Sequence, residues 1–173
     1  MSMNKTLIIV DVQYDFMEGG ALAVKGANTA YAKRIEEIKP LFNQVILTAD
    51  YHPANHVSFT TFPPHCIAGT PGADIAIEAN GNVLLKGEDK ETEEFSAFSN
   101  GKNVKGITGD EVYVLGLAGD YCVKQTLLDL MQYIPIKKLY AIKDLIYSVD
   151  GTRYENTDYF DGKVTFINSN QLT

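Results

Sequence analysis

All three histidines of this 173-residue chain, at positions 52, 56 and 65, lie within one short segment. Asp50 precedes the first of them by two residues, so on an extended backbone the side chains of Asp50 and His52 leave on the same face and can bind one ion. A carboxylate with imidazoles suits Zn²⁺, Fe²⁺ or Mn²⁺, and the spacing does not choose among them. Three unrelated surface histidines are the alternative interpretation, but their concentration in one segment favours a metal site.

The thiol of Cys122 is the candidate nucleophile. This residue follows an apolar run and a Gly-containing turn, at the predicted start of a helix. Backbone N–H groups and the positive end of the helix dipole stabilise a thiolate there, and the same N–H groups can hold an oxyanion formed on a substrate carbonyl. A lone cysteine is more often buried and inert, so this hypothesis depends on which other groups reach Cys122. Cys66, in contrast, is interpreted as structural.

Two charged residues complete the candidate chemistry. Asp11 directly follows the apolar run at 7–10, where its carboxylate could take the thiol proton and later donate a proton to a leaving amine. Capping a helix or turn is the alternative role, and the neighbouring Asp15 suits that role better. Lys86 ends another apolar run, before Gly87, and could stabilise the thiolate and the carboxylate electrostatically.

The elements that must position these groups are predicted from apolar runs that are nearly continuous rather than alternating. Such runs are typical of strands covered on both faces, as in a parallel sheet. Strands are predicted at 6–10, 44–49, 82–86, 111–116, 137–142 and 163–167, and helices at 28–40 and about 121–133. The expected fold class is α/β: an open, doubly wound, mostly parallel sheet of about six strands with helices on both faces.

The predicted sheet brings the candidate groups to one edge. Ligands of open parallel sheets bind in the crevice outside the carboxyl ends of the strands. Asp11, Asp50 and Lys86 follow or end the first three predicted strands, and Cys122 lies just beyond the fourth. The Pro- and Gly-rich segment 51–79 is predicted to be a functional loop over this edge rather than a linker.

Composition limits the classes of function. A length of 173 residues with 45% hydrophobic residues suits one domain, expected to span 1–173. The net charge of −7 and the lack of a Lys/Arg cluster argue against nucleic acid and anionic membranes as partners. No signal peptide or spanning segment is recognisable, so a cytoplasmic protein with reduced thiols is expected. The partner is then a small-molecule substrate, and the sequence leaves homo-oligomerisation open.

Five motifs, DVQYDF, DYHPANHVSF, PPHCIAGTPGA, LLKG and GLAGDYCV, occur in the order found in isochorismatase-like cysteine hydrolases, and the chain resembles the nicotinamidases among them over nearly its full length. The resemblance implies a catalytic set of Asp11, Lys86 and Cys122. It also implies one divalent metal ion, zinc first with iron or manganese as alternatives, with His56 as a further ligand in some members. The implied metal ligands are Asp50, His52 and His65.

The resemblance extends to the surroundings of the nucleophile. It implies a cis peptide at residues 117–118 and oxyanion donors in the backbone N–H groups of Ala118 and Cys122. It places Phe16, Phe62 and Tyr121 in the walls of the substrate pocket. Two positions depart from the family pattern. Phe62 stands where Trp is usual, and Gly119 stands where Thr is common, which leaves the rigidity of that turn open.

The function implied is hydrolysis of nicotinamide to nicotinate and ammonia through a thioester, a reaction of pyridine nucleotide salvage. A related hydrolase acting on isochorismate, ureido or carbamoyl substrates is the alternative, although such members generally lack the Asp/His metal set. A nucleotide-binding module is disfavoured because DVQYDF follows the first strand where a Gly-rich loop would be needed. A catalytically silent scaffold that keeps the metal for structure is the remaining alternative.

Overall fold

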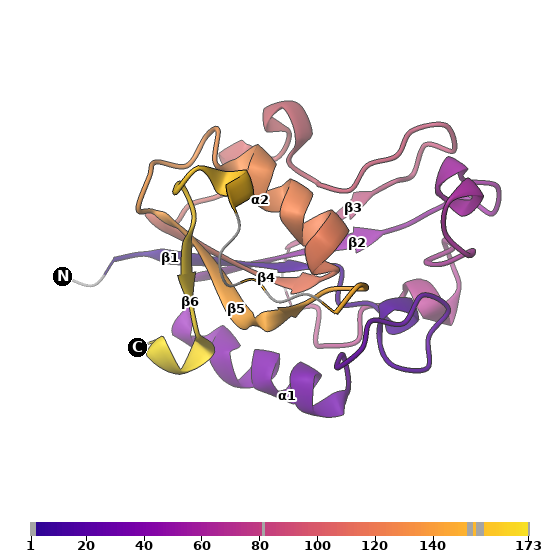
Figure 1. The fold of residues 1–173 in the computed structure, drawn as a ribbon, viewed down its shortest axis with the longest axis horizontal. Coiled ribbons are helices and arrows are strands. Elements are labelled where there is room, and N and C mark those ends of the chain that lie inside the picture. Colours follow the sequence, from indigo (N-terminus) through magenta and orange to yellow (C-terminus); the bar gives the residue numbers. More distant parts are fainter. Residues whose placement is uncertain (1–2, 81, 152–153, 155–157, 173) are drawn as a thin grey trace.

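The computed structural model describes residues 3–80, 82–151, 154 and 158–172. Within them, six parallel strands form one sheet in the order β3-β2-β1-β4-β5-β6 (Figure 1). The strands are β1 (Lys5–Val10), β2 (Gln44–Asp50), β3 (Asn82–Lys86), β4 (Glu111–Leu117), β5 (Leu139–Tyr147) and β6 (Thr165–Ile167). Helix α1 (Thr29–Ile38) covers one face and α2 (Lys124–Leu130) the other. The predicted α/β class is confirmed.

The central strands of the sheet, β1, β2 and β4, are buried because they are apolar on both faces. The β1 residues from Leu7 to Val10 are at most 1% exposed, and α1 packs on the sheet through Tyr31, Ile35 and Ile38. The hydroxyl of Tyr31 donates a hydrogen bond to the carbonyl of Leu145 in β5, at 2.8 Å, so this buried polar atom is satisfied. This packing fixes the strand ends on which the candidate site depends.

Two elements differ from their predicted bounds by more than two residues. A five-residue π-helix, Gly119–Val123, precedes α2, which ends at Leu130 rather than near residue 133. Strand β5 continues to Tyr147 instead of ending at residue 142, with a shift in its register against β4 between Val114 and Gly116. The prediction stopped early because the charged pair at 143–144 interrupts the apolar run, whereas the strand passes through it.

The segment 51–79 is irregular, as predicted, and it folds against the carboxyl edge of the sheet. It contains two short 3-10 helices, Val57–Thr60 and Pro71–Ala73. A single parallel bridge joins His52 to Ile67 and closes the segment into a loop. Among the described residues, no helix combines the length and the apolar character needed to cross a membrane.

Candidate active site

Strand register brings the candidate residues together. In the sheet, Asp50 pairs with Lys86, and Val10 pairs with Thr48 on one side and Gly116 on the other. Asp11 follows directly after Val10, so it emerges between the ends of β2 and β4. This is where the strand order reverses, the usual ligand crevice of an open parallel sheet. The structure therefore brings the predicted acid, cation and first metal ligand to one edge.

Lys86 lies at the centre of a buried cluster of charged side chains. Its Nζ atom lies 2.7 Å from Asp11 Oδ2, 2.5 Å from Asp50 Oδ1 and 3.5 Å from Cys122 Sγ, and its side chain is fully buried. Burial alone would favour a neutral amine, but the charges of Asp11 and Asp50 outweigh it and raise the pKa of Lys86 well above its usual value. The site thus holds an ammonium between two carboxyl groups and a thiol.

The candidate nucleophile, the sulfur of Cys122, is a buried thiol. Burial, opposed by Lys86 but reinforced by the two carboxylates, raises the pKa of Cys122 well above its usual value. The expected stabilisation of a resting thiolate by the helix start is therefore outweighed, because desolvation of a fully buried sulfur is the larger effect. A base must remove the proton, and Asp11 is beside it: Asp11, Asp50 and Cys122 can bring ligand atoms within 4.8 Å of one another.

Thr48 holds the carboxyl group of Asp11, and sequence reasoning missed it. Its hydroxyl donates to Asp11 Oδ1 at 2.7 Å, and its carbonyl accepts the N–H of Asp11 at 3.1 Å. Burial raises the pKa of Asp11, and the nearby ammonium of Lys86 opposes this rise. A polar residue inside an apolar strand, two positions before Asp50, is a signal that could have identified Thr48.

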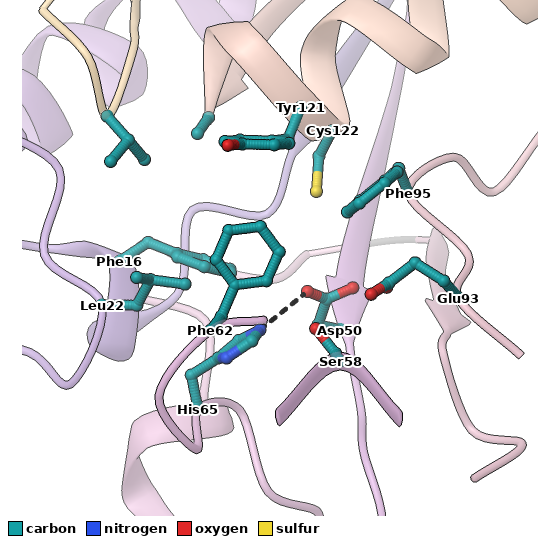
Figure 2. A pocket seen from close by; sticks show the side chains of 12 residues that line it. Phe16, Leu22, Asp50, Ser58, Phe62, His65, Glu93, Phe95, Tyr121 and Cys122 are labelled. Carbon is teal, nitrogen blue, oxygen red and sulfur yellow. Dashed lines mark ion pairs between the residues drawn. The ribbon is translucent and has the colours of Figure 1, made fainter. Parts of the chain in front are cut away.

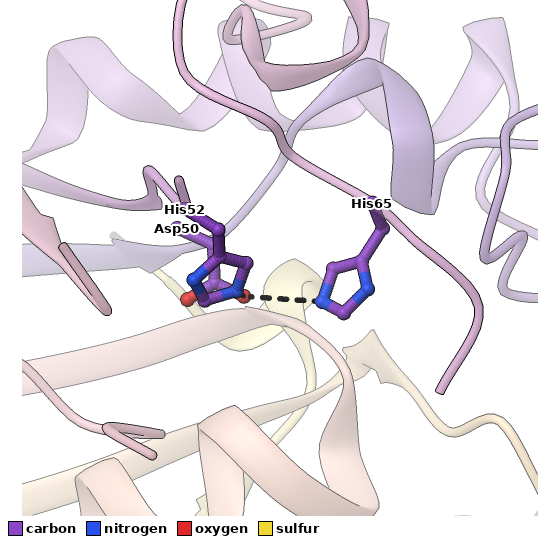
Figure 3. A group of neighbouring side chains, drawn as sticks. All are labelled: Asp50, His52 and His65. Atoms are coloured by element: carbon purple, nitrogen blue, oxygen red, sulfur yellow. Dashed lines mark ion pairs between the residues drawn. The ribbon is translucent and has the colours of Figure 1, made fainter. Parts of the chain in front are cut away.

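Asp50, His52 and His65 form the second cluster, and all three are buried (Figure 3). His52 Nδ1 faces the carbonyl of Gly87 at 2.8 Å, and His65 Nδ1 faces the carbonyl of Pro63 at 2.8 Å. A carbonyl only accepts, so each Nδ1 is assigned as the donor, and each neutral ring keeps its lone pair on Nε2. Both Nε2 atoms face Asp50 Oδ2, at 3.4 and 3.8 Å.

The fourth candidate ligand, His56, is excluded by its hydrogen bonds. Its Nδ1 accepts the backbone N–H of Ser58 at 3.1 Å, and its Nε2 lies 3.0 Å from the carbonyl of Thr92. Its ring stacks on that of His52 with centroids 4.0 Å apart. His56 therefore packs against one face of the His52 ring and does not contribute a ligand atom to the cluster of Asp50, His52 and His65.

Two further residues, Gln13 and Asp15, hold the segment that carries the candidate metal ligands. Gln13 brackets Asp50, since its amide donates to the carbonyl of Asp50 at 2.8 Å and accepts its N–H at 2.9 Å. Asp15 accepts a hydrogen bond from the N–H of Cys66 at 2.7 Å, which supports the purely structural role expected for Asp15. Cys66 is a free, fully buried thiol at positive φ, and burial raises its pKa strongly. No signal in the sequence singles out Gln13.

An aromatic pocket lies above these clusters (Figure 2). The three predicted wall residues, Phe16, Phe62 and Tyr121, all line it, and the rings of Phe62 and Tyr121 meet edge to face with centroids 5.0 Å apart. In Figure 2 the sulfur of Cys122 points into the pocket and toward the carboxylate of Asp50. Lining residues outside the predicted set are Leu22, Ser58, Glu93, Phe95 and Val149.

The backbone around the nucleophile follows the expected pattern. The peptide at Leu117–Ala118 is cis, and Ala118 lines the pocket beside Cys122. Gly116 has a φ of 135°, and a Cβ there would lie 2.2 Å from the carbonyl oxygen of Val10, so only glycine fits. This close approach of β4 to β1 positions the turn that carries Cys122 against Asp11.

Comparison with known proteins is decisive about the family. Residues 5–133 match the model of the Isochorismatase domain. The chain belongs to the isochorismatase-like hydrolases. Among curated members of this family, the nicotinamidase/pyrazinamidase of Mycobacterium tuberculosis is 39% identical over 155 residues, which cover 74% of this chain and 79% of that protein. Relatives of this kind identify the chain as an enzyme of the nicotinamidase group and an amidohydrolase.

Solved structures of the isochorismatase-like hydrolases agree with this assignment. PnC1 from L. infantum, in complex with nicotinate, has a TM-score of 0.85 at 30% identity, with 100% of this chain and 96% of that chain covered. The pyrazinamidase of Pyrococcus horikoshii, in complex with zinc, has a TM-score of 0.77 at 24% identity, over 95% and 99% of the two chains. The second likeness supports the fold alone.

Proposed function

We propose that this chain hydrolyses nicotinamide to nicotinate and ammonia through a thioester on Cys122. The observation that carries the proposal is the single cluster in which Lys86 contacts Asp11, Asp50 and the sulfur of Cys122 at the base of an aromatic pocket. A flat pyridine ring suits such walls. The nicotinamidase relatives and the complex of PnC1 with nicotinate support the choice of substrate.

The chemistry follows from the roles of the cluster. Asp11 accepts the proton of Cys122, and the thiolate attacks the carboxamide carbon. The tetrahedral intermediate collapses, the C–N bond breaks, and ammonia leaves with the proton from Asp11. Water, deprotonated by Asp11, then attacks the thioester carbon. The C–S bond breaks, the nicotinic acid product leaves, and the sulfur regains its proton from Asp11. Lys86 remains charged throughout and stabilises the negative charge that moves between carboxylate and sulfur.

The oxyanion would be held by backbone N–H groups of the turn after β4. Ala118 and Cys122 both line the pocket, and the π-helix begins directly after Ala118. Donors that are fixed before the reaction stabilise developing charge more strongly than water that must reorient. The proposed donors are the N–H groups of Ala118 and Cys122.

The histidine cluster fits a divalent metal ion. Two Nε2 lone pairs and one carboxylate converge at one point. His52 Nε2 is buried without a hydrogen-bond partner, and a metal ion would bind its lone pair. A bound ion would supply a Lewis-acid contact that orients the substrate. Zinc suits the donor set best, with iron or manganese as alternatives. The complete Asp/His set also favours a nicotinamidase over the related hydrolases for ureido or carbamoyl substrates.

The first test is release of ammonia from nicotinamide by the purified protein, with and without a chelator. We expect turnover, and we expect removal of the metal to lower kcat/KM by about 100-fold, since misplacement of a substrate by about 1 Å has this effect. Zinc, manganese or iron should restore the rate. Failure to release ammonia from nicotinamide in any metal-loaded form would refute the proposed function, and full activity of metal-free protein would refute the role of the ion.

Gly87→Ala tests the metal site without removing a ligand. A Cβ on Gly87 would lie 2.4 Å from Cε1 of His52, whose ring is already packed on His56. We expect affinity for zinc to fall by about 10- to 100-fold, the usual effect of disturbing the groups that orient a ligand. Gly162→Ala is the matched control, because Gly162 has nearly the same φ, 70° against 68°, but open space around it.

Both alanine variants should lose about 1–2 kcal/mol of stability because alanine is strained at positive φ, and Gly87→Ala should lose more through its contact with His52. Only Gly87→Ala should lose zinc, as measured by metal content after purification and by competition with a chromogenic chelator. Equal zinc affinity in the two variants would contradict the placement of the ion at His52.

A further inference from the structure

A carboxylate links the turn of the nucleophile to the turn that follows β5. Asp120 Oδ1 accepts the backbone N–H of Val149 at 3.1 Å, and its Oδ2 accepts that of Asp150 at 3.1 Å. Hydrogen bonds to an ionised acceptor are about twice as strong as those between neutral groups. The turn at 148–151, hereafter the outer turn, is closed by a hydrogen bond from the N–H of Gly151 to the carbonyl of Ser148 at 3.1 Å.

The two turns also pack in direct contact. A Cβ on Gly119 would lie 2.5 Å from Ser148 Oγ and 2.9 Å from Ile146 Cγ2. The glycine at this position, a departure from the family pattern, is therefore what lets the end of β5 approach the nucleophile turn. The turn is not loosened by the missing side chain, because Ser148 and Ile146 fill the space. The outer turn is thus located both by this contact and by the carboxylate of Asp120.

Val149 projects from the outer turn into the wall of the substrate pocket, which Leu22 also lines. The residue is 42% exposed. A half-exposed apolar side chain is held weakly by packing, so its position depends on the backbone that carries it. That backbone is fixed at the N–H of Val149 itself, the atom that Asp120 binds. The carboxylate of Asp120 therefore determines where this part of the wall stands.

We propose that Asp120 is a specificity-determining positioning residue, which holds Val149 as the wall that excludes substituted pyridine rings from the pocket. The proposal rests on the proposed nicotinamidase function. It predicts that loss of the carboxylate widens the pocket, and that nicotinamides with an added methyl group on the ring gain relative to nicotinamide itself. Asp120 touches neither the substrate nor the reacting atoms in this role.

The test is the ratio of kcat/KM for nicotinamide to kcat/KM for 5- and 6-methylnicotinamide, taken for the analogue that the wild-type enzyme rejects more strongly. In Asp120→Asn a single amide oxygen replaces two carboxylate oxygens, and the amide N–H₂ group cannot accept from the second N–H. We expect the ratio to fall by about 10-fold, the scale at which pockets discriminate one methylene. A variant that only misfolds or displaces Cys122 would lower both rates together and leave the ratio unchanged.

Asp144→Asn is the matched control, because Asp144 also accepts two hydrogen bonds, from the N–H and the hydroxyl of Ser169, at 2.7 and 2.6 Å, outside the pocket lining. It should leave the ratio unchanged. Val149→Ala shortens the wall without touching Asp120, and it should lower the ratio as well. An unchanged ratio in Asp120→Asn overturns the proposal, whether or not Val149→Ala changes it.

The failure of this proposal and that of the proposed function are distinguishable. If the wild-type protein does not hydrolyse nicotinamide, the proposed function fails, and the same ratio is then measured with dissociation constants for nicotinate and its methyl derivatives by calorimetry. A fall of that binding ratio in Asp120→Asn but not in Asp144→Asn supports the role of Asp120 as the residue that positions the wall. No difference between the two variants overturns it.

Discussion

Cys122→Ala is expected to lower kcat for nicotinamide by about 10⁴- to 10⁶-fold, the range found when a covalent nucleophile is removed. The thiol is the only group in the described pocket lining that can attack a carboxamide carbon with Asp11 beside it as a base. The residual rate would come from binding and from the backbone donors alone. Initial rates of ammonia release, measured at saturating nicotinamide, give the ratio directly.

Cys66→Ala is the matched control, since Cys66 is the second free and buried thiol of the chain. Its sulfur is not part of the pocket lining, so its removal should leave kcat within the same order of magnitude. Acid quenching during turnover should trap a nicotinoyl adduct on intact Cys66→Ala enzyme and none on Cys122→Ala. Comparable activity of the Cys122→Ala and wild-type enzymes would contradict the thioester, and so would an adduct mapped to another residue.

Protection against a thiol reagent separates an active enzyme from a silent scaffold. Cys122 is 5% exposed and rests as a thiol, so alkylation at neutral pH should be slow. Nicotinamide should slow it further by filling the pocket above the sulfur. A rate of alkylation that does not depend on nicotinamide would favour the silent scaffold.

The residues at the strand ends could be predicted because a parallel sheet gives the carboxyl ends of its strands a common edge. Asp11, Asp50 and Lys86 each end or follow an apolar strand, and this pattern is visible in the sequence. The partner of each charge could not be predicted in this way. That Lys86 contacts Asp50 as well as Asp11 depends on the register of β2 against β3, which the short apolar run of β3 does not specify.

Other features of the site lie beyond sequence patterns for different reasons. His56 has the residue type and spacing of a metal ligand, and only its hydrogen bonds to Ser58 and to the carbonyl of Thr92 exclude it. Phe95 and Val149 reach the pocket from irregular segments, whose path is set by tertiary contacts rather than by periodicity. Position 119 shows the same limit, because glycine there indicates flexibility until the packing of Ser148 is known.

Replacing Lys86 by Met is expected to lower both stability and activity, since it leaves Asp11 and Asp50 buried without their ammonium partner. Removal of one member of a buried ion pair typically lowers the free energy of unfolding by about 3–5 kcal/mol. Loss of its electrostatic contribution should lower kcat by about 10²- to 10³-fold in the fraction that remains folded. Denaturant unfolding and rate measurements normalised to folded protein separate the two effects.

Lys102→Met is the control for loss of a lysine ion pair. Lys102 lies 3.5 Å from Glu94 with its side chain 54% exposed, so its removal should change stability by at most about 1 kcal/mol. The double variant Lys86→Met with Asp11→Asn removes one of the two carboxylates left without a partner. It should therefore recover part of the lost stability, while kcat falls further. If the loss of stability in the double variant instead equalled the sum of the losses in Lys86→Met and Asp11→Asn, the two residues would not be coupled. The buried cluster would then not be what holds the base and the nucleophile together.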